Sequence, residues 1–498
     1  MFLQRFKVLL LGLLFVGLPT YKLLQGVVGA QSRIETAMWL MPFAGILLLI
    51  NYRIHFHLLL LSMLIPITLP RIMVNRALSL FAIIPLVLWV GAILRMFLQI
   101  PAPASTNRKL DVFMTLCTII TVMWLAVEPP GSGSFGTERG GAWEGVFAIA
   151  GLAAYWGIRS LRGLSFNWKR LSLLSVMGAI AGIGYMTVTQ VANQASAGLV
   201  IASWFFQSGW WLYGILLGII IKIQQRKNRM FSSLPLYILS ILLLANALTS
   251  GFRSRIIFGP FMVGVAFWAG GMRKRMFFTA LFFLIVCAFI ANSQYYNDLP
   301  RTIRRVVSVV RAEEDQKDIG FGEMGRKSPW RAQLWQTAQT KIKEKPITGH
   351  GYSFNIDAFF ADLSSARYAD FMLRGLQGAG QFHNLPLNLM YFWGIPAAII
   401  FCIGWMMALT HLLKWAGQAE GWYGAFVVAM IVYATASTGQ ALMNAGGQDF
   451  LAICTIMGIY QMMRGRNLKT GNHTPPKVAE DKNDAAKPAP GQPMIGIP

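Results

Sequence analysis

Charged side chains are scarce in this sequence: Asp, Glu, Lys and Arg make up 13% of its 498 residues, whereas hydrophobic residues make up 55%. The hydrophobic residues fall in runs of about 17 to 25 residues, close to the length of a helix that crosses a bilayer. Because a helix satisfies its own backbone hydrogen bonds in lipid, these runs predict an all-α polytopic membrane protein. We expect one bundle of about 12–14 transmembrane helices.

Cysteine is also rare. The four cysteines, Cys117, Cys287, Cys402 and Cys454, each lie inside a hydrophobic run, so neither a disulfide framework nor a zinc site is expected. Acidic residues are few as well, and the excess of Lys and Arg gives a formal net charge of +24. These basic residues lie mostly in short segments between hydrophobic runs, which is typical of the positive-inside rule and not of nucleic-acid binding.

The hydrophobic runs predict where the transmembrane helices lie. The expected ranges are 8–28, 37–50, 57–70, 77–99, 110–127, 143–158, 171–189, 200–223, 234–249, 256–270, 276–292, 385–411, 422–440 and 447–463. Some of them, 143–158 and 256–270 included, are short for a full crossing, which leaves room for a re-entrant pair. No small-residue cleavage site follows MFLQRFK and its hydrophobic run, so we expect a retained first helix.

The basic residues also predict orientation. With a cytoplasmic N-terminus, the inside segments carry about three times as many Lys and Arg residues as the short outside loops. Both termini are then cytoplasmic, and one large helical loop faces outward. The predicted units are transmembrane helices at 1–292, the loop at 293–383, further transmembrane helices at 384–464 and a tail at 465–498. The tail, rich in Pro, Lys, Asp and Ala, is expected to be disordered.

One segment of the loop predicts a well-defined helix. Ser328 can cap its N-terminus, Pro329 is tolerated at the first helical position, and Pro346 ends it. The apolar residues Trp330, Leu334, Ala338 and Ile342 recur every four positions. This spacing places them on one face, so we expect the helix to pack on top of the bundle.

Four residues on the outward side are candidates for chemistry. His383 ends the loop directly before Asn384. Its neutral imidazole can act as a general base. The alternative to this catalytic role is a structural one, as a polar anchor at the membrane boundary. Arg253 and Arg255 stand between two hydrophobic runs and are suited either to bind an anion or to reach lipid phosphates. Arg331 lies on the predicted loop helix, where a solvated residue or salt-bridge partner is the alternative. Together the four suggest a diphosphate site beside a base.

Three motifs occur in order between about residues 240 and 400. The first is an Arg-bearing turn, TSGFRSR. The second, RAQLWQTAQTKIKEKPITGHG, contains an Arg, a Trp four residues later and a P-x-x-G-x-G turn; the third, HNLPLNLMYFWG, opens the next membrane helix with His-Asn. Their order, spacing and sidedness resemble the O-antigen ligase and polymerase superfamily of bacterial envelope-glycan enzymes.

The resemblance implies a metal-independent glycosyltransferase of the bacterial inner membrane, without a cofactor and with a periplasmic active site. Its donor would be a glycan on undecaprenyl diphosphate, transferred en bloc to an acceptor hydroxyl. By position, His383 would activate that hydroxyl, while Arg331 and one of Arg253 and Arg255 would hold the diphosphate. The family pattern has a single Arg in the turn, so both arginines remain candidates.

The motifs leave several functions open. The acceptor is lipid A-core sugar in a ligase, another lipid-linked repeat unit in a polymerase and a protein hydroxyl in a third relative. A flippase or transporter of lipid-linked glycan is the alternative from another class, although it would need charged residues along a path through the bilayer. A structural or sensory membrane protein is the last alternative, and it leaves the outward arginines unexplained.

Overall fold

The computed structural model describes residues 52–64, 84–90, 108–127, 141–161, 166–192, 207–227, 253–274, parts of 277–294, 329–352, 382, 384–444 and 447–467. Across these residues the regular elements are helices and no strand occurs. The all-α architecture predicted from the hydrophobic runs is therefore confirmed for the described part of the chain.

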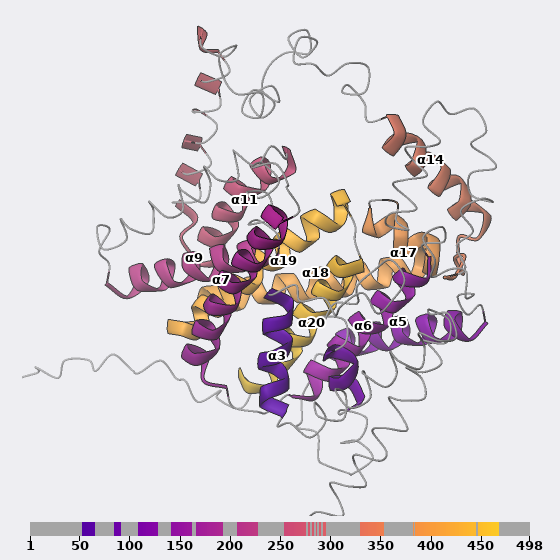
Figure 1. The fold of residues 1–498 in the computed structure, drawn as a ribbon, viewed down its shortest axis with the longest axis horizontal. Helices are drawn as coiled ribbons and strands as arrows, with labels where there is room; N and C mark the ends of the chain where they lie inside the picture. The colour runs from indigo at the N-terminus through magenta and orange to yellow at the C-terminus, as the bar shows by residue number, and fades with distance from the viewer. Residues whose placement is uncertain are drawn as a thin grey trace, which may run out of the picture.

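The helices follow one another along the chain and form a bundle (Figure 1). They are α3 (Tyr52–Leu64), α5 (Arg108–Val127), α6 (Gly141–Ser160), α7 (Trp168–Ala192), α9 (Gln207–Lys227), α11 (Arg253–Ala269), α14 (Pro329–Glu344), α17 (Leu385–Trp393), α18 (Ile395–Gln418), α19 (Gly421–Asn444) and α20 (Gly447–Asn467). Within the described ranges, three stretches are both long and apolar enough to cross a membrane: Arg108–Val127, Ile395–Gln418 and Gly421–Leu442. Helix α6 has 20 residues, so the expectation that this run is short for a crossing was wrong.

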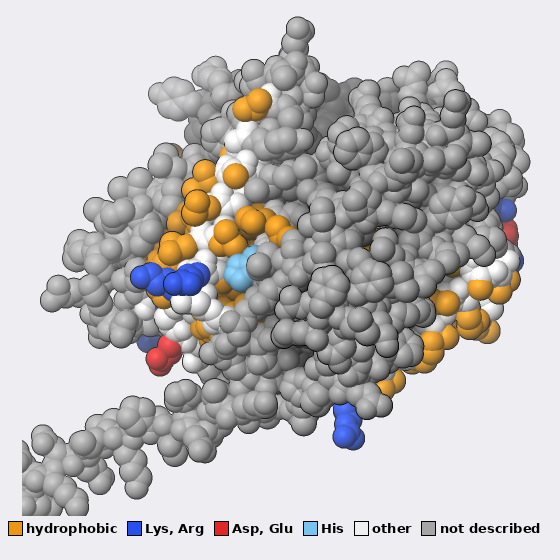
Figure 2. Space-filling view, turned by 60° about the horizontal axis from the view of Figure 1, so that its bottom comes forward, with side chains coloured by type: hydrophobic (Ala, Val, Ile, Leu, Met, Phe, Trp, Pro, Cys, Tyr) orange, Lys and Arg blue, Asp and Glu red, His pale blue; other side chains and the backbone are white. Residues whose placement is uncertain are grey.

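Helix α5 shows how a membrane helix divides its surface. Leu110, Met114, Cys117 and Thr121 are buried at spacings of three and four, and the remaining face is both exposed and apolar. The exposed residues include Val112, Leu116, Ile119 and Met123. Hydrophobic side chains also reach the surface in the view of Figure 2. A helix that is apolar on its exposed as well as its buried face is suited to contact lipid.

Close packing at the centre of the bundle depends on small residues. A Cβ atom on Gly218 of α9 would lie 2.5 Å from the Ala425 carbonyl oxygen of α19. A Cβ atom on Gly458 of α20 would lie 3.1 Å from the Tyr155 Cα of α6. These glycines let pairs of helices approach along their backbones, as is common where lipid gives no hydrophobic driving force.

The prediction of a single helix over 385–411 was wrong. The structure divides it into α17 and α18 at Gly394, which has φ +86°. Pro396 lies in the first turn of α18. Backbone amides in the first turn have no partner within the helix, so a proline there costs no hydrogen bond. The chain therefore turns after Trp393, and α17 forms a short separate helix at the end of the bundle.

The predicted loop helix is confirmed as α14, which begins at Pro329 and ends at Glu344, two residues before Pro346. Leu334, Ala338 and Ile342 are buried, as their spacing predicted. Helix α14 packs against α17. This segment of the loop is therefore folded onto the bundle.

Candidate active site

The two residues that flank His383 are held by hydrogen bonds from both α14 and α17. Trp335 of α14 donates its indole N–H to the Phe382 carbonyl oxygen at 2.8 Å. The Phe382 amide donates to Asn388 Oδ1 of α17 at 2.9 Å. On the other side, Asn384 caps α17 by accepting from the Leu387 amide at 3.1 Å. The backbone is thus fixed immediately before and after position 383.

The turn that follows α14 pairs with the end of α17. The amides of His350 and Gly351 donate to the carbonyl oxygens of Tyr391 and Phe392, at 2.7 and 3.1 Å. In the opposite direction, the Ile395 amide donates to the Pro346 carbonyl oxygen at 2.8 Å. Because these amides already have partners, the glycine-rich turn does not form a phosphate-binding cradle. It instead attaches α14 to the break between α17 and α18.

The contact between the 346–351 turn and the end of α17 requires glycine at three positions. Gly349, Gly351 and Gly394 have φ values of +74°, +67° and +86°, which side chains other than glycine rarely adopt. A Cβ atom on Gly349 would lie 2.5 Å from the Gly394 nitrogen, and one on Gly351 would lie 2.5 Å from the indole ring of Trp124. The turn therefore touches α5 as well as α17.

We expect Gly394→Ala to destabilise the protein by at least about 2 kcal/mol. Its new Cβ would meet the Ile347 carbonyl oxygen, and its backbone would remain in a left-handed conformation. Thermal unfolding of the purified protein in detergent measures the change. Gly417→Ala in α18 is the matched control, because no other group lies within 4 Å of the new atom. Equal melting temperatures for Gly394→Ala and wild type would contradict the docked turn.

His350 has a structural contact that the sequence did not predict. Its Nε2 lies 2.7 Å from the Lys341 carbonyl oxygen near the end of α14, and its ring stacks on Tyr391 of α17 at 4.6 Å. The side chain therefore connects the C-terminal turn of α14 to α17. Its position inside a G-x-G turn was visible in the sequence, but its partners come from other elements.

The structure places the backbone of the three predicted arginines. Arg253 and Arg255 lie in the first turn of α11, whereas a loop between two helices was predicted. The helix extends to them because no Pro or Gly separates them from the hydrophobic run, and free amides at a helix N-terminus favour anions. Arg331 is the third residue of α14. His383 and these arginine side chains lie outside what the structure describes, so their convergence stays a prediction.

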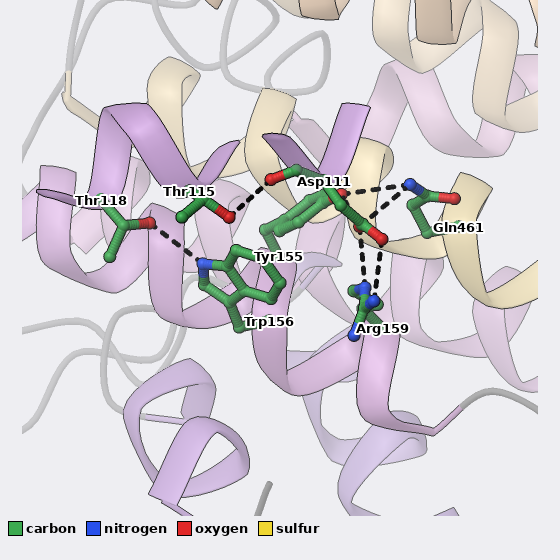
Figure 3. Close-up of polar contacts among 7 residues, drawn as sticks. All are labelled: Asp111, Thr115, Thr118, Tyr155, Trp156, Arg159 and Gln461. Atoms are coloured by element: carbon green, nitrogen blue, oxygen red, sulfur yellow. Dashed lines mark hydrogen bonds and ion pairs between the residues drawn. The ribbon is translucent and has the colours of Figure 1, made fainter. Parts of the chain in front are cut away.

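The opposite end of the bundle carries a charged network that the sequence did not predict (Figure 3). Asp111 of α5 accepts two hydrogen bonds from Arg159 of α6, at 2.7 and 2.8 Å, and one from the Tyr155 hydroxyl at 2.7 Å. Gln461 of α20 donates to the same carboxylate at 3.2 Å. The turn at 346–351 contacts Trp124 near the other end of α5, so the network and the turn lie at opposite ends of this helix.

Within the described residues, no three His, Cys, Asp or Glu side chains come close enough together to hold a metal ion. The polar groups that the structure describes at the α17 end of the bundle include backbone amides, indoles, side-chain amides, the His350 imidazole and the Tyr352 hydroxyl. Fold and contacts together define an all-α polytopic membrane protein with a helical loop segment attached to one end of its bundle.

Residues 238–402 match a family model described as O-Antigen ligase. The match includes α11, α14, α17 and the beginning of α18, and it confirms the resemblance to the O-antigen ligase and polymerase superfamily. It supports glycan transfer of the ligase or polymerase type, from a lipid-linked donor to a glycan acceptor in general terms. A search of curated proteins found no match for this chain.

Proposed function

We propose that this protein transfers a glycan en bloc from undecaprenyl diphosphate to an acceptor hydroxyl on the periplasmic side of the bacterial inner membrane. His383 takes the proton of the hydroxyl, whose oxygen forms a bond to the anomeric carbon. The bond between that carbon and the diphosphate oxygen breaks, and undecaprenyl diphosphate leaves with the bonding electrons. No cofactor takes part, because the diphosphate linkage supplies the free energy.

The observation that carries this proposal is the anchoring of the chain on both sides of His383. A general base must be held within hydrogen-bond reach of the proton it removes. Trp335 and Asn388 hold the backbone of Phe382, and the side chain of Asn384 caps α17. All four residues lie in the matched segment, as do the three arginines.

The arginines have the complementary role. A guanidinium group makes paired hydrogen bonds to phosphate oxygens and stays charged at all working pH values. Arg331, with Arg253 or Arg255, binds the diphosphate and stabilises the negative charge that develops as it leaves. The free amides at the N-terminus of α11 favour the same charge. Fixed positive groups and one base therefore suffice for a metal-independent reaction.

Reconstituted transfer tests the proposal. The purified protein, supplied with an undecaprenyl-diphosphate-linked glycan and an acceptor, is expected to form product at the same rate with and without EDTA. Loss of product in EDTA would contradict metal independence. Movement of the donor across vesicle membranes without product would favour a flippase instead.

Gene deletion separates the ligase from the polymerase. Long glycan chains left on the undecaprenyl carrier in the deleted strain identify a ligase, whereas capped single-unit chains identify a polymerase. If the envelope glycan is unchanged, transfer to a protein hydroxyl is the remaining function, and glycoprotein staining detects it.

A further inference from the structure

The turn that attaches α14 to α17 carries a large hydrophobic side chain on its surface. Ile347 is 74% exposed, although its backbone packs closely: a Cβ atom on Gly394 would meet the Ile347 carbonyl group. The residues on either side are held as well. The Pro346 carbonyl oxygen accepts from the Ile395 amide at 2.8 Å, and the Thr348 carbonyl oxygen accepts from an indole of α5 at 2.9 Å. Ile347 is therefore presented to the outside by a fixed backbone.

The position of the turn along α5 follows from that indole, which belongs to Trp124. Long side chains of a helix lean toward its N-terminus, so the turn lies level with Trp124 or slightly nearer the N-terminus of α5. Val122, Met123 and Val127, on either side of Trp124 in the sequence, are all exposed. Ile347 is thus exposed at a level where the surface of α5 is apolar.

This level lies close to one end of the apolar surface of α5. Val127 is the last residue of the helix, and the charged Glu128 follows it in the sequence. Trp side chains are enriched where hydrocarbon meets headgroups, because the ring is apolar and its N–H needs an acceptor. Trp124 has both properties, since its N–H is donated to the turn. The turn therefore lies at the depth where acyl chains meet headgroups.

Two lysines precede Ile347 on the same surface segment. Lys343 in the last turn of α14 and Lys345 directly after the helix are both exposed. Glu344 pairs with Lys341 at 3.0 Å, and among the described residues no carboxylate pairs with the other two lysines. A lysine side chain can lay its apolar stem along hydrocarbon and extend its ammonium group to the headgroups. These two positive charges are therefore suited to bind headgroup phosphates.

The surroundings of Ile347 select the occupant of this surface. A single exposed isoleucine that faces water is common and indicates nothing. A specific protein partner would need about 800 Å² of surface, whereas the exposed hydrophobic side chain of this turn stands beside lysines and adjoins the lipid-facing side of α5. An anionic phospholipid meets both features, because its acyl chains contact the isoleucine and its phosphate contacts the lysines.

We propose that residues 343–348 anchor α14 to the membrane surface. Ile347 contacts acyl chains, and Lys343 and Lys345 bind the phosphate of an anionic phospholipid beside it. In the predicted orientation this lipid belongs to the outer leaflet. The anchor sets the depth of the loop helix relative to the bilayer. The proposal goes beyond the proposed function, since it concerns the lipid around the protein and not the glycan that is transferred.

Photocrosslinking of the intact protein in vesicles tests the proposal. The probes are phosphatidylglycerol and phosphatidylcholine, each with a diazirine at the same position near the start of one acyl chain. Tandem mass spectrometry assigns the adducts to residues. Val188, exposed near the C-terminal end of α7, is the reference for a lipid-facing residue away from the turn. We expect both lipids to label Ile347 and Val188. Phosphatidylglycerol should label Ile347 at least about twofold more than phosphatidylcholine, because each lysine attracts anionic lipid, and the two should label Val188 equally.

A double variant separates the headgroup contact from the acyl-chain contact. Lys343→Gln with Lys345→Gln removes both charges and leaves Ile347 in place. Labelling of Ile347 should then be equal for the two lipids, while labelling of Val188 stays unchanged. Lys109→Gln is the matched control, because it removes an exposed positive charge at the opposite end of α5. It should leave the preference for phosphatidylglycerol at Ile347 as in wild type.

Three results would overturn the proposal. If Ile347 carries no lipid adduct in vesicles where Val188 is labelled, water or another protein covers the turn and the membrane contact is wrong. If both lipids label Ile347 equally in wild type, or if the double variant keeps the preference, the lysines do not bind headgroups. If an undecaprenyl-diphosphate-linked glycan at the same concentration as the probe removes the phosphatidylglycerol adduct, the surface binds the lipid donor and not the surrounding phospholipid.

Discussion

Replacing His383 with Ala is expected to lower kcat for glycan transfer by at least about a hundredfold, the usual contribution of a general base. The acceptor hydroxyl then attacks without a group to take its proton, while the lipid donor still binds the arginines. The effect should therefore fall on kcat, with KM for the donor changed little. Reconstituted transfer with a labelled lipid-linked glycan measures both.

His350 provides the matched control, since it is a second histidine in the same loop region with a structural role. Gln can still donate to the Lys341 carbonyl oxygen, so His350→Gln should stay within about threefold of the wild-type rate. A His383→Ala enzyme that folds and transfers glycan at the wild-type rate would exclude His383 as the base. If His350→Gln loses most of the transfer rate while His383→Ala keeps it, His350 in the 346–351 turn is the general base instead.

The second large effect is expected from Asp111→Ala at the opposite end of the bundle. Asp111 is 14% exposed and Arg159 29% exposed at the side chain, so the pair is largely removed from water. Removing one partner of a buried ion pair costs about 3–5 kcal/mol, because the other charge stays buried. We expect about 3 kcal/mol, since Arg159 keeps part of its surface. Tyr155 and Gln461 also lose an acceptor, although they remain 3.2 Å from each other. The free energy of unfolding in mixed micelles measures the loss.

A double-mutant cycle separates the ion pair from general damage. The double variant Asp111→Ala with Arg159→Ala should be less destabilised than the sum of the single variants, because each single variant leaves one unpaired charge and the double variant leaves none. Thr115→Ala is the control in the same helix, because its exposed hydroxyl bonds only the Asp111 carbonyl oxygen within α5. Additive effects of Asp111→Ala and Arg159→Ala would contradict a coupled network.

The sequence predicted α14 well because every signal for it is local. Pro329 and Pro346 mark its ends, and Leu334, Ala338 and Ile342 recur with the helical period. The division between α17 and α18 was also visible, in the Gly and Pro of WGIP, but the surrounding hydrophobic residues favoured one long helix. The continuous hydrophobic run therefore predicted one helix, although the positive φ at Gly394 interrupts it.

The contacts that position the candidate site could not be predicted, because they join residues far apart in the sequence. Trp335 lies 47 positions from Phe382, and Trp124 lies 224 positions from Thr348, whose carbonyl oxygen it binds. Gln461 lies 350 positions from Asp111. Periodicity assigns each of these residues to a helix, but only the packing of the helices chooses their partners.

The exposed apolar face of α5 has a consequence for the lipid around the protein. It extends from Val112 to Val127, and in the sequence it lies between the charged residues Lys109 and Glu128. At 1.5 Å per residue this is about 22 Å, several Å less than the roughly 30 Å hydrocarbon layer of a typical bilayer. Tilting the helix would shorten the span further. The bilayer beside α5 should therefore thin to relieve the hydrophobic mismatch, and lipids with shorter acyl chains should be enriched there.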